Sequence, residues 1–242
     1  IGRHLLGISI AKMPGGFQMG FCTYTIGCFN GYLDTASLRQ GNMATFQSIP
    51  NLVNDARLQT YTVYFLSPTY AVDRLAFRYQ RVSRTQLPPP YSADRSTDDF
   101  QTHTPLDFPV LNGAFRFTAQ DLDFASDGTI YACGYDMGIA VSTDTGLTWS
   151  TLWYVQGENW AVVRLVLSAT FVEDGIMAAL VDPTPDPHAE SGDNYVYLST
   201  TGGEVWRRLE WAGRGWKNIA LTVTGGFPVV IGLDLNGFPP IH

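Results

Sequence analysis

The sequence predicts an all-β chain made of repeated four-stranded antiparallel sheets, and three observations support this. Charged residues make up 15% of the 242 residues, against about 25% in an average soluble protein, and helices need such residues on their exposed faces. Aromatic residues make up 13%, and 24 glycines and 14 prolines punctuate the chain, which is typical of short strands joined by tight turns. The third observation is an internal repeat.

The clearest copy of the repeat begins at Leu122 and closes at Trp149. Alternating apolar segments separated by turn residues predict its strands, which cover residues 122–125, 129–133, 138–141 and 152–154. The same order returns from Arg164, with a turn at Glu173–Gly175 and strands over 164–168, 176–181 and 195–198. Two further strands are predicted over 219–223 and 229–233.

Earlier copies are more degenerate but keep the period. Tyr64–Asp73 parallels Leu165–Asp174 and shares the phrase Leu-Ser-x-Thr-aromatic. Serines at positions 37, 92, 142 and 199 are separated by 55, 50 and 57 residues, and aromatic residues at 46, 100, 149 and 206 by 54, 49 and 57. A period of about 50 residues indicates a β-propeller whose blades have four antiparallel strands.

The repeat predicts about four to five blades in a single propeller domain, or propeller fragment, over residues 1–242. The expected blades cover residues 5–50, 60–105, 113–155 and 161–211, followed by a partial blade over 217–242. The sequence begins with Ile1 rather than Met, so we expect a processed product or a fragment. Because an open propeller exposes strand edges, we expect a larger ring, closure with fewer blades, or completion by another subunit, and we favour the fragment.

One segment has a specific resemblance. Ser142-x-Asp144-x-Gly146-x-x-Trp149 resembles the Asp-box (BNR) motif of sialidase-like β-propellers, and Ser199, Gly203 and Trp206 form a copy in which Thr201 replaces the aspartate. The resemblance implies a propeller fold, a structural role for these residues away from any active site, and an extracytoplasmic location (secreted, periplasmic or cell-surface). In such a turn Ser or Asp can accept backbone N–H bonds, Gly supplies a positive φ, and Trp packs between blades.

The charge pattern excludes some partners. A net charge of -7 argues against nucleic-acid binding, since that needs a basic face. Met13–Leu33 carries no charged residue but is interrupted by Pro14 and several glycines, so two or three strands fit it better than a membrane span. Cys22 and Cys28 are predicted to face each other across a hairpin, as a disulfide or as two free thiols, and Cys133 is expected to be an apolar filler.

An acidic interval is the candidate metal site. Four carboxylates between the predicted second and third strands of one blade could hold calcium, which prefers oxygen ligands; they are Asp182, Asp186, Glu190 and Asp193. The three prolines of this interval favour the alternative of a stiff, solvated loop. No other cofactor is predicted.

Two further groups of residues are candidates for a binding or catalytic site. Trp160, Trp211 and Trp216 could form aromatic platforms for a glycan, whereas packing between blades accounts for Trp149 and Trp206. A catalytic carboxylate pair could be drawn from Asp121, Asp123, Asp127 and Asp136, although acids in surface turns are the simpler interpretation. No catalytic residue can be assigned from the sequence.

The sequence therefore favours a non-catalytic, extracytoplasmic propeller that acts as a binding or assembly module, with a protein partner or a glycan as ligand. The alternative is a glycoside hydrolase of sialidase-like or endoglucanase-like type. A third hypothesis is a subunit of a larger complex whose open blade is completed by a neighbour.

Overall fold

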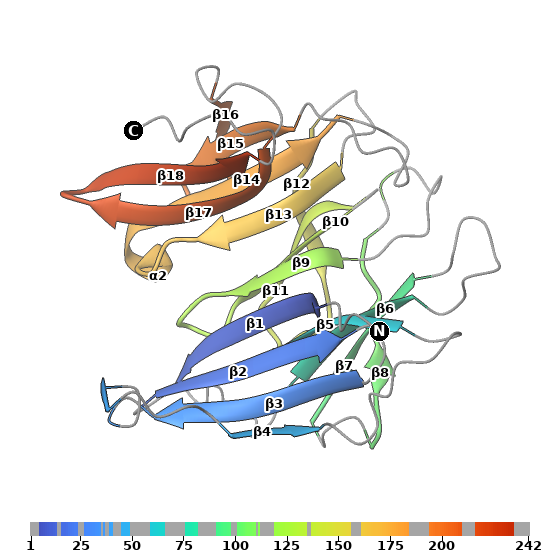
Figure 1. The fold of residues 1–242 in the computed structure, drawn as a ribbon. Coiled ribbons are helices and arrows are strands. Elements are labelled where there is room, and N and C mark those ends of the chain that lie inside the picture. The colour runs from blue at the N-terminus through green and yellow to red at the C-terminus, as the bar shows by residue number, and fades with distance from the viewer. Residues whose placement is uncertain are drawn as a thin grey trace. The chain divides into compact units, whose positions relative to one another are not determined.

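In the computed structural model, the regular secondary structure of the described residues consists almost entirely of strands (Figure 1). It separates into two compact units, Ile1–Leu106 and Asp107–His242. The residues that the structure describes are 5–13, 16–23, 27–34, 36, 39–40, 45–48, 59–65, 76–81, 91–97, 101–109, 111, 119–134, 137–155, 161–183, 194–209 and 216–234.

The N-terminal unit contains two four-stranded antiparallel sheets, each with its strands in chain order. The first consists of β1 (Leu5–Met13), β2 (Gly16–Thr23), β3 (Gly27–Asp34) and β4 (Thr45–Ser48). The second consists of β5 (Gln59–Phe65), β6 (Ala76–Arg81), β7 (Tyr91–Ser96) and β8 (Thr104–Pro105).

The C-terminal unit contains two further four-stranded sheets and a two-stranded one. The first consists of β9 (Ala119–Phe124), β10 (Ile130–Gly134), β11 (Gly138–Ser142) and β12 (Ser150–Trp153). The next consists of β13 (Ala161–Leu167), β14 (Met177–Asp182), β15 (Tyr195–Ser199) and β16 (Trp206–Arg208). The last is the hairpin of β17 (Trp216–Thr224) and β18 (Phe227–Asp234).

Every strand in these sheets pairs antiparallel with the next strand along the chain, as the repeat predicts. One prediction needs correction. Two of the three residues of the turn expected at Glu173–Gly175 belong instead to a short helix, α2 (Phe171–Asp174), which is followed by Gly175 in the left-handed conformation with φ 62°. A residue without a Cβ is suited to that position.

The core of the C-terminal unit lies between its sheets, and β14 contributes side chains to it from both of its faces. All six of its residues are buried. Met177, Ala179 and Val181 face sheet β9–β12 in one apolar cluster, while Ala178 and Leu180 face β17–β18 in another. Because successive side chains of a strand point to opposite faces, a continuous apolar run is what a strand with sheets on both faces requires.

The segments considered for other roles are strands. The uncharged stretch that begins at Met13 forms β2 and β3, and no helix among the described residues is long and apolar enough to cross a membrane. Within the β2–β3 pair, Cys22 lies directly opposite Cys28. Their side chains lie outside what the structure describes, so a disulfide and two free thiols both remain open. Cys133 is a buried free thiol on β10.

Candidate functional site

A turn closed by a serine and a tryptophan joins β11 to β12. In this first hairpin (Ser142–Trp149), the Ser142 hydroxyl oxygen accepts a hydrogen bond from the Gly146 amide at 2.9 Å. The Trp149 indole nitrogen donates to the Gly146 carbonyl oxygen at 3.2 Å. Ser142 is 2% exposed, so these bonds anchor the base of the turn in the sheet.

Asp144 supports the tip of the same hairpin. Its carboxylate accepts the amides of Leu147 and Thr148 at 3.1 and 2.9 Å and the hydroxyls of Ser142 and Thr148 at 2.8 and 2.5 Å. The bonds from Thr148 contribute most to lowering the pKa of Asp144 to about 2, because they stabilise the ionised form. All four of these hydrogen bonds of the Asp144 carboxylate are made within the hairpin.

A second hairpin (Ser199–Trp206) joins β15 to β16 with the same anchors. The Ser199 hydroxyl oxygen accepts the Gly203 amide at 3.0 Å, and the Trp206 indole donates to the Gly203 carbonyl at 2.8 Å. Thr201 stands where the first hairpin has Asp144, and its hydroxyl oxygen accepts only one tip amide, that of Val205, at 2.8 Å. The turn survives the loss of the carboxylate.

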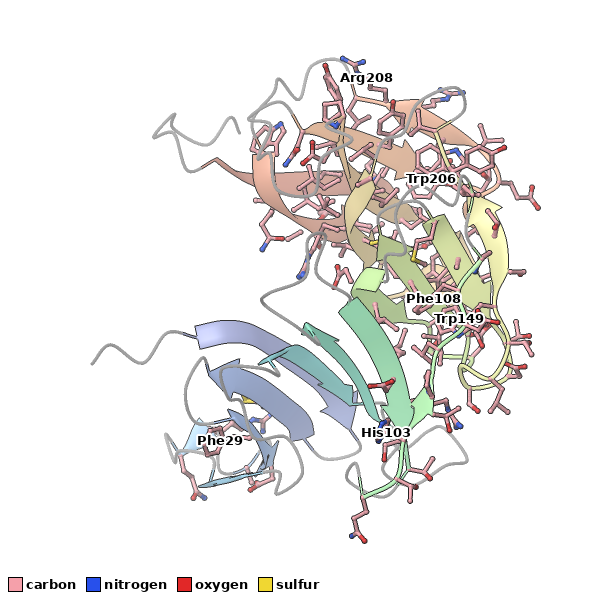
Figure 2. The ribbon with its side chains drawn as sticks, turned by 90° about the vertical axis from the view of Figure 1, so that its right-hand side faces the viewer. Phe29, His103, Phe108, Trp149, Trp206 and Arg208 are labelled. Carbon is pink, nitrogen blue, oxygen red and sulfur yellow. The ribbon has the colours of Figure 1, made fainter. Side chains whose placement is uncertain are left out.

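The two indoles contact different surfaces. The ring of Trp206 stacks on Trp153 of the preceding sheet, with centroids 4.7 Å apart and an interplanar angle of 26°. Trp149 instead packs against Phe108, 4.7 Å away, in the segment before β9, and the two rings lie side by side in Figure 2. Trp206 thus fills the space between two sheets, whereas Trp149 covers the chain that leads into its own sheet.

Two of the candidate carboxylates lie between sheets. Asp121 and Asp123 are on β9, an end strand of its sheet, and they face β13, the end strand of the next. Asp121 accepts the Leu165 amide at 3.1 Å, and Asp123 accepts the Leu167 amide at 2.8 Å. Residues two apart share a face of a strand, so two side chains of β9 satisfy two edge amides of β13.

The two carboxylates differ in their electrostatic surroundings. Asp121 forms an ion pair with Arg164 of β13, with 3.3 Å between Nε and Oδ2. Burial raises the pKa of Asp123 from 3.8 to about 6, opposed by the amides of Leu167 and Phe124 that bond to its ionised form. Asp121 raises this pKa further and Arg164 lowers it. The sequence did not point to Arg164.

The other two carboxylates considered for catalysis are not part of this group. Asp127 is exposed in the turn after β9, where it accepts the Thr129 amide at 2.9 Å. Asp136 lies outside the described residues. Among the carboxylates that the structure describes, Asp121 and Asp123 are therefore the pair that it brings together.

The acidic interval leaves the sheet at the opposite end from the two hairpins. β14 ends at Asp182 and β15 begins at Tyr195, so both boundaries of the interval lie at one end of their sheet. Asp182 is buried, and the neighbouring Asn194 is also buried and donates from Nδ2 to the Trp216 carbonyl at 2.7 Å. Asp186, Glu190 and Asp193 lie outside the described residues, and no group of three metal-ligating side chains occurs within them. The calcium site remains a prediction.

Of the three candidate aromatic platforms, the structure describes only Trp216. It begins β17 and packs against the cluster of Ala178, Leu180 and Val196. Its ring also covers Gly232 on β18, where an added Cβ would overlap the indole. Packing therefore accounts for this indole, while Trp160 and Trp211 lie outside the described residues.

The sequence phrase Leu-Ser-x-Thr forms a second polar turn, and the sequence did not predict its hydrogen bonds. In the phrase Leu-Ser-x-Thr, the Ser168 hydroxyl donates to Asp174 at 2.7 Å and the Thr170 hydroxyl donates to it at 2.8 Å. Asp174 also accepts the Ile176 amide at 2.8 Å. Burial raises the pKa of Asp174, but these hydrogen bonds together outweigh it and lower the pKa. The phrase is thus a structural turn at Ser168–Asp174, and its copy at Ser67–Asp73 lies outside the described residues.

Comparison with solved structures shows which known folds the chain resembles. An ancestral GH74 enzyme matches 97% of the chain with a TM-score of 0.61 at 12% identity. An α-L-arabinanase of Penicillium chrysogenum, complexed with arabinobiose, matches 96% with a TM-score of 0.55 at 13% identity. YCF48 bound to D1 peptide matches 96% with a TM-score of 0.51, also at 13% identity.

The chain has the β-propeller fold. It spans 30% of the GH74 enzyme, 62% of YCF48 and 76% of the arabinanase. No protein-family model and no curated protein matches the sequence. At these identities the comparisons establish the fold, so each four-stranded sheet is a propeller blade, and the chemistry must be argued from this chain's own residues.

Proposed function

We propose that the chain is a non-catalytic β-propeller module that works outside the cytoplasm by binding a protein partner. The observation that carries this proposal is an exposed apolar face on the β17–β18 hairpin. Phe227, Val229 and Ile231 alternate along β18 and are 75, 43 and 56% exposed. Alternation places all three on one face of the strand.

The two faces of this hairpin have different neighbours. Ile219, Leu221 and Val230 pack against the blade β13–β16. Within the part of the chain that the structure describes, Phe227, Val229 and Ile231 of the opposite face pack against no apolar cluster, and the outer edge of β18 pairs with no strand. Grouped apolar side chains on a surface mark a site of interaction more often than scattered ones do, and an open strand edge favours association with another chain.

The surroundings of Asp121 and Asp123 support a non-catalytic role. Asp121 and Asp123 accept hydrogen bonds from backbone amides of the next blade, and these bonds link the two blades. A catalytic carboxylate must instead reach a substrate. We therefore assign this pair a structural role.

We also propose that the two hairpins are Asp-boxes and that the protein is sialidase-like in architecture. Support comes from the bonds of Ser142, Asp144 and Gly146 at the first hairpin and of Ser199 and Gly203 at the second. This assignment favours a secreted, periplasmic or cell-surface protein. YCF48, a structural neighbour that was solved with a bound peptide, supports a protein ligand.

The test uses two surface variants. F227S/I231S should abolish binding of the hydrophobic dye bis-ANS and any self-association seen by sedimentation velocity, with the fold retained because both side chains are exposed. L147S alters another exposed apolar side chain, 61% exposed at the first hairpin, and serves as the matched control. Equal effects of the two variants would contradict the proposed surface.

The second candidate function is glycoside hydrolysis. The similarity of fold to a GH74 enzyme and an arabinanase and the raised pKa of Asp123 beside Asp121 favour it. Xyloglucan, arabinan and an aryl sialoside are suitable probes. The proposed binding role predicts no turnover of any of them, and turnover that D123N abolishes in a folded protein would establish the hydrolase instead.

A further inference from the structure

Two acidic side chains and one basic side chain lie at the contact between blades β9–β12 and β13–β16. Asp121 and Asp123 face the edge of β13, and Arg164 is the basic residue paired with Asp121. With both carboxylates ionised the group carries one excess negative charge between two packed sheets. Asp121 is buried and Asp123 is half-buried, and two neighbouring carboxylates with restricted access to water ionise together only at a cost.

The other titratable groups that face the pair do not change charge near neutral pH. Tyr131 and Cys133 of β10 lie opposite Asp123 and Asp121 in the strand register. Burial raises the pKa of both side chains above their ordinary values, so both stay neutral. Arg164 stays charged. Among the described residues around the pair, Asp123 is thus the group that takes up a proton as the pH falls toward its raised pKa.

The hydrogen bonds to β13 do not require the charged form. Asp123 accepts the Leu167 amide through one oxygen, Oδ2, and the Phe124 amide through the other, Oδ1, each at 2.8 Å. A protonated carboxyl keeps acceptor capacity, so the bond to Leu167 can persist when the excess charge is removed. Protonation would then relieve repulsion without opening the contact.

We propose that Asp121 and Asp123 form a proton-sensitive latch between these two blades, which holds them more firmly in mildly acidic than in neutral solution. The direction follows from linkage. The pKa of Asp123 is about 6 in the folded chain and 3.8 is its ordinary value, so folding takes up a proton between these limits. A raised carboxyl pKa gives stability that is present at low pH and lost as pH rises through about 6.

The test compares urea unfolding at pH 5.0 and 7.5, followed by tryptophan fluorescence, since all six tryptophans lie in the unit Asp107–His242. The latch should make the unfolding equilibrium constant about tenfold smaller at pH 5.0. D123N keeps an acceptor oxygen but cannot ionise, and it should remove this tenfold difference. D127N, which alters the exposed carboxylate after β9, should keep it.

A second measurement covers the case in which D123N does not fold. Hydrogen exchange of the wild-type protein, corrected for intrinsic rates, should show greater protection of the Leu165 and Leu167 amides at pH 5.0 than at pH 7.5. Amides in the middle of β14 serve as the internal reference. Equal protection at both pH values, or a D123N protein with the wild-type pH dependence, would overturn the proposal.

Discussion

The two hairpins of the C-terminal unit reach one shape with different residues. Both use a serine hydroxyl to accept a glycine amide and an indole to donate to that glycine's carbonyl. They differ at the third position, where the first has Asp144, whose carboxylate accepts two tip amides, and the second has Thr201. The turn thus forms without a carboxylate at this position, where one threonine bond takes its place, and the carboxylate of Asp144 accepts further hydrogen bonds.

In backbone conformation, by contrast, the second hairpin is the more favourable one. Thr145 in the first hairpin has φ 62°, a left-handed conformation that disfavours residues with a Cβ, while the equivalent position in the second is Gly202 with φ 68°. The first hairpin combines a strained residue with a well-bonded aspartate, and the second combines a relaxed glycine with a single threonine bond. Each hairpin has one favourable feature that the other lacks.

Removing the shared indole should have the largest effect. W206A deletes a ring stacked on Trp153 between two blades and should lower the free energy of unfolding by about 3 kcal/mol. W149A, which removes the contact with Phe108, should cost about 2 kcal/mol. Urea unfolding measured by circular dichroism checks both.

A matched variant separates the ring from its hydrogen bond. W206F keeps an aromatic surface but loses the indole N–H, and should cost about 1 kcal/mol. A cost for W206F equal to that of W206A would show that the indole hydrogen bond, rather than packing between blades, contributes most of the stability that Trp206 provides.

The carboxylate should come next in magnitude. D144A leaves the amides of Leu147 and Thr148 without their acceptor at the exposed tip and should cost about 1 kcal/mol at pH 7. The pKa of Asp144 is lowered to about 2, so the advantage of the wild type is present above about pH 4 and declines as pH falls toward 2. Unfolding of both proteins at pH 7, 4 and 2.5 checks this. T201A is the control, since a hydroxyl should give a difference independent of pH.

Replacing the strained Thr145 by glycine should have the smallest effect of these substitutions. T145G should stabilise the protein by about 0.5 kcal/mol, because relief of the left-handed strain exceeds the added entropy of the unfolded chain. G202A should destabilise it by about 1 kcal/mol, and strain alone would account for this, since no atom lies within 4 Å of the added Cβ. Thermal unfolding of both variants tests the comparison. A destabilised T145G would mean that the Thr145 side chain makes a stabilising contact.

Much of the fold could be predicted from the sequence because each blade repeats one local pattern. The apolar run of β14 and the turn residues around it predict a buried strand between two turns, and the structure has one over Met177–Asp182. The one-turn helix α2 was missed. Its four residues are too few to show a helical period, and polar bonds from Ser168 and Thr170 to Asp174 organise it instead.

The candidate site was less accessible to sequence analysis. Asp121 and Asp123 were two of four aspartates from which a pair could be drawn, but their partners are amides of β13 more than forty residues away, and no local pattern encodes that distance. Their spacing of two residues on a strand was the available signal, since it places both on one face.

The sequence by itself determined the repeating unit, the antiparallel order of its strands and the residues that close its two hairpins, because these depend on neighbours within a few positions along the chain. Only the tertiary structure decided which blade each indole covers, which backbone amides the aspartates of β9 accept, and which face of β18 is left exposed. Those outcomes depend on how whole sheets pack, and the free energy of that packing comes from residues that are distant in sequence.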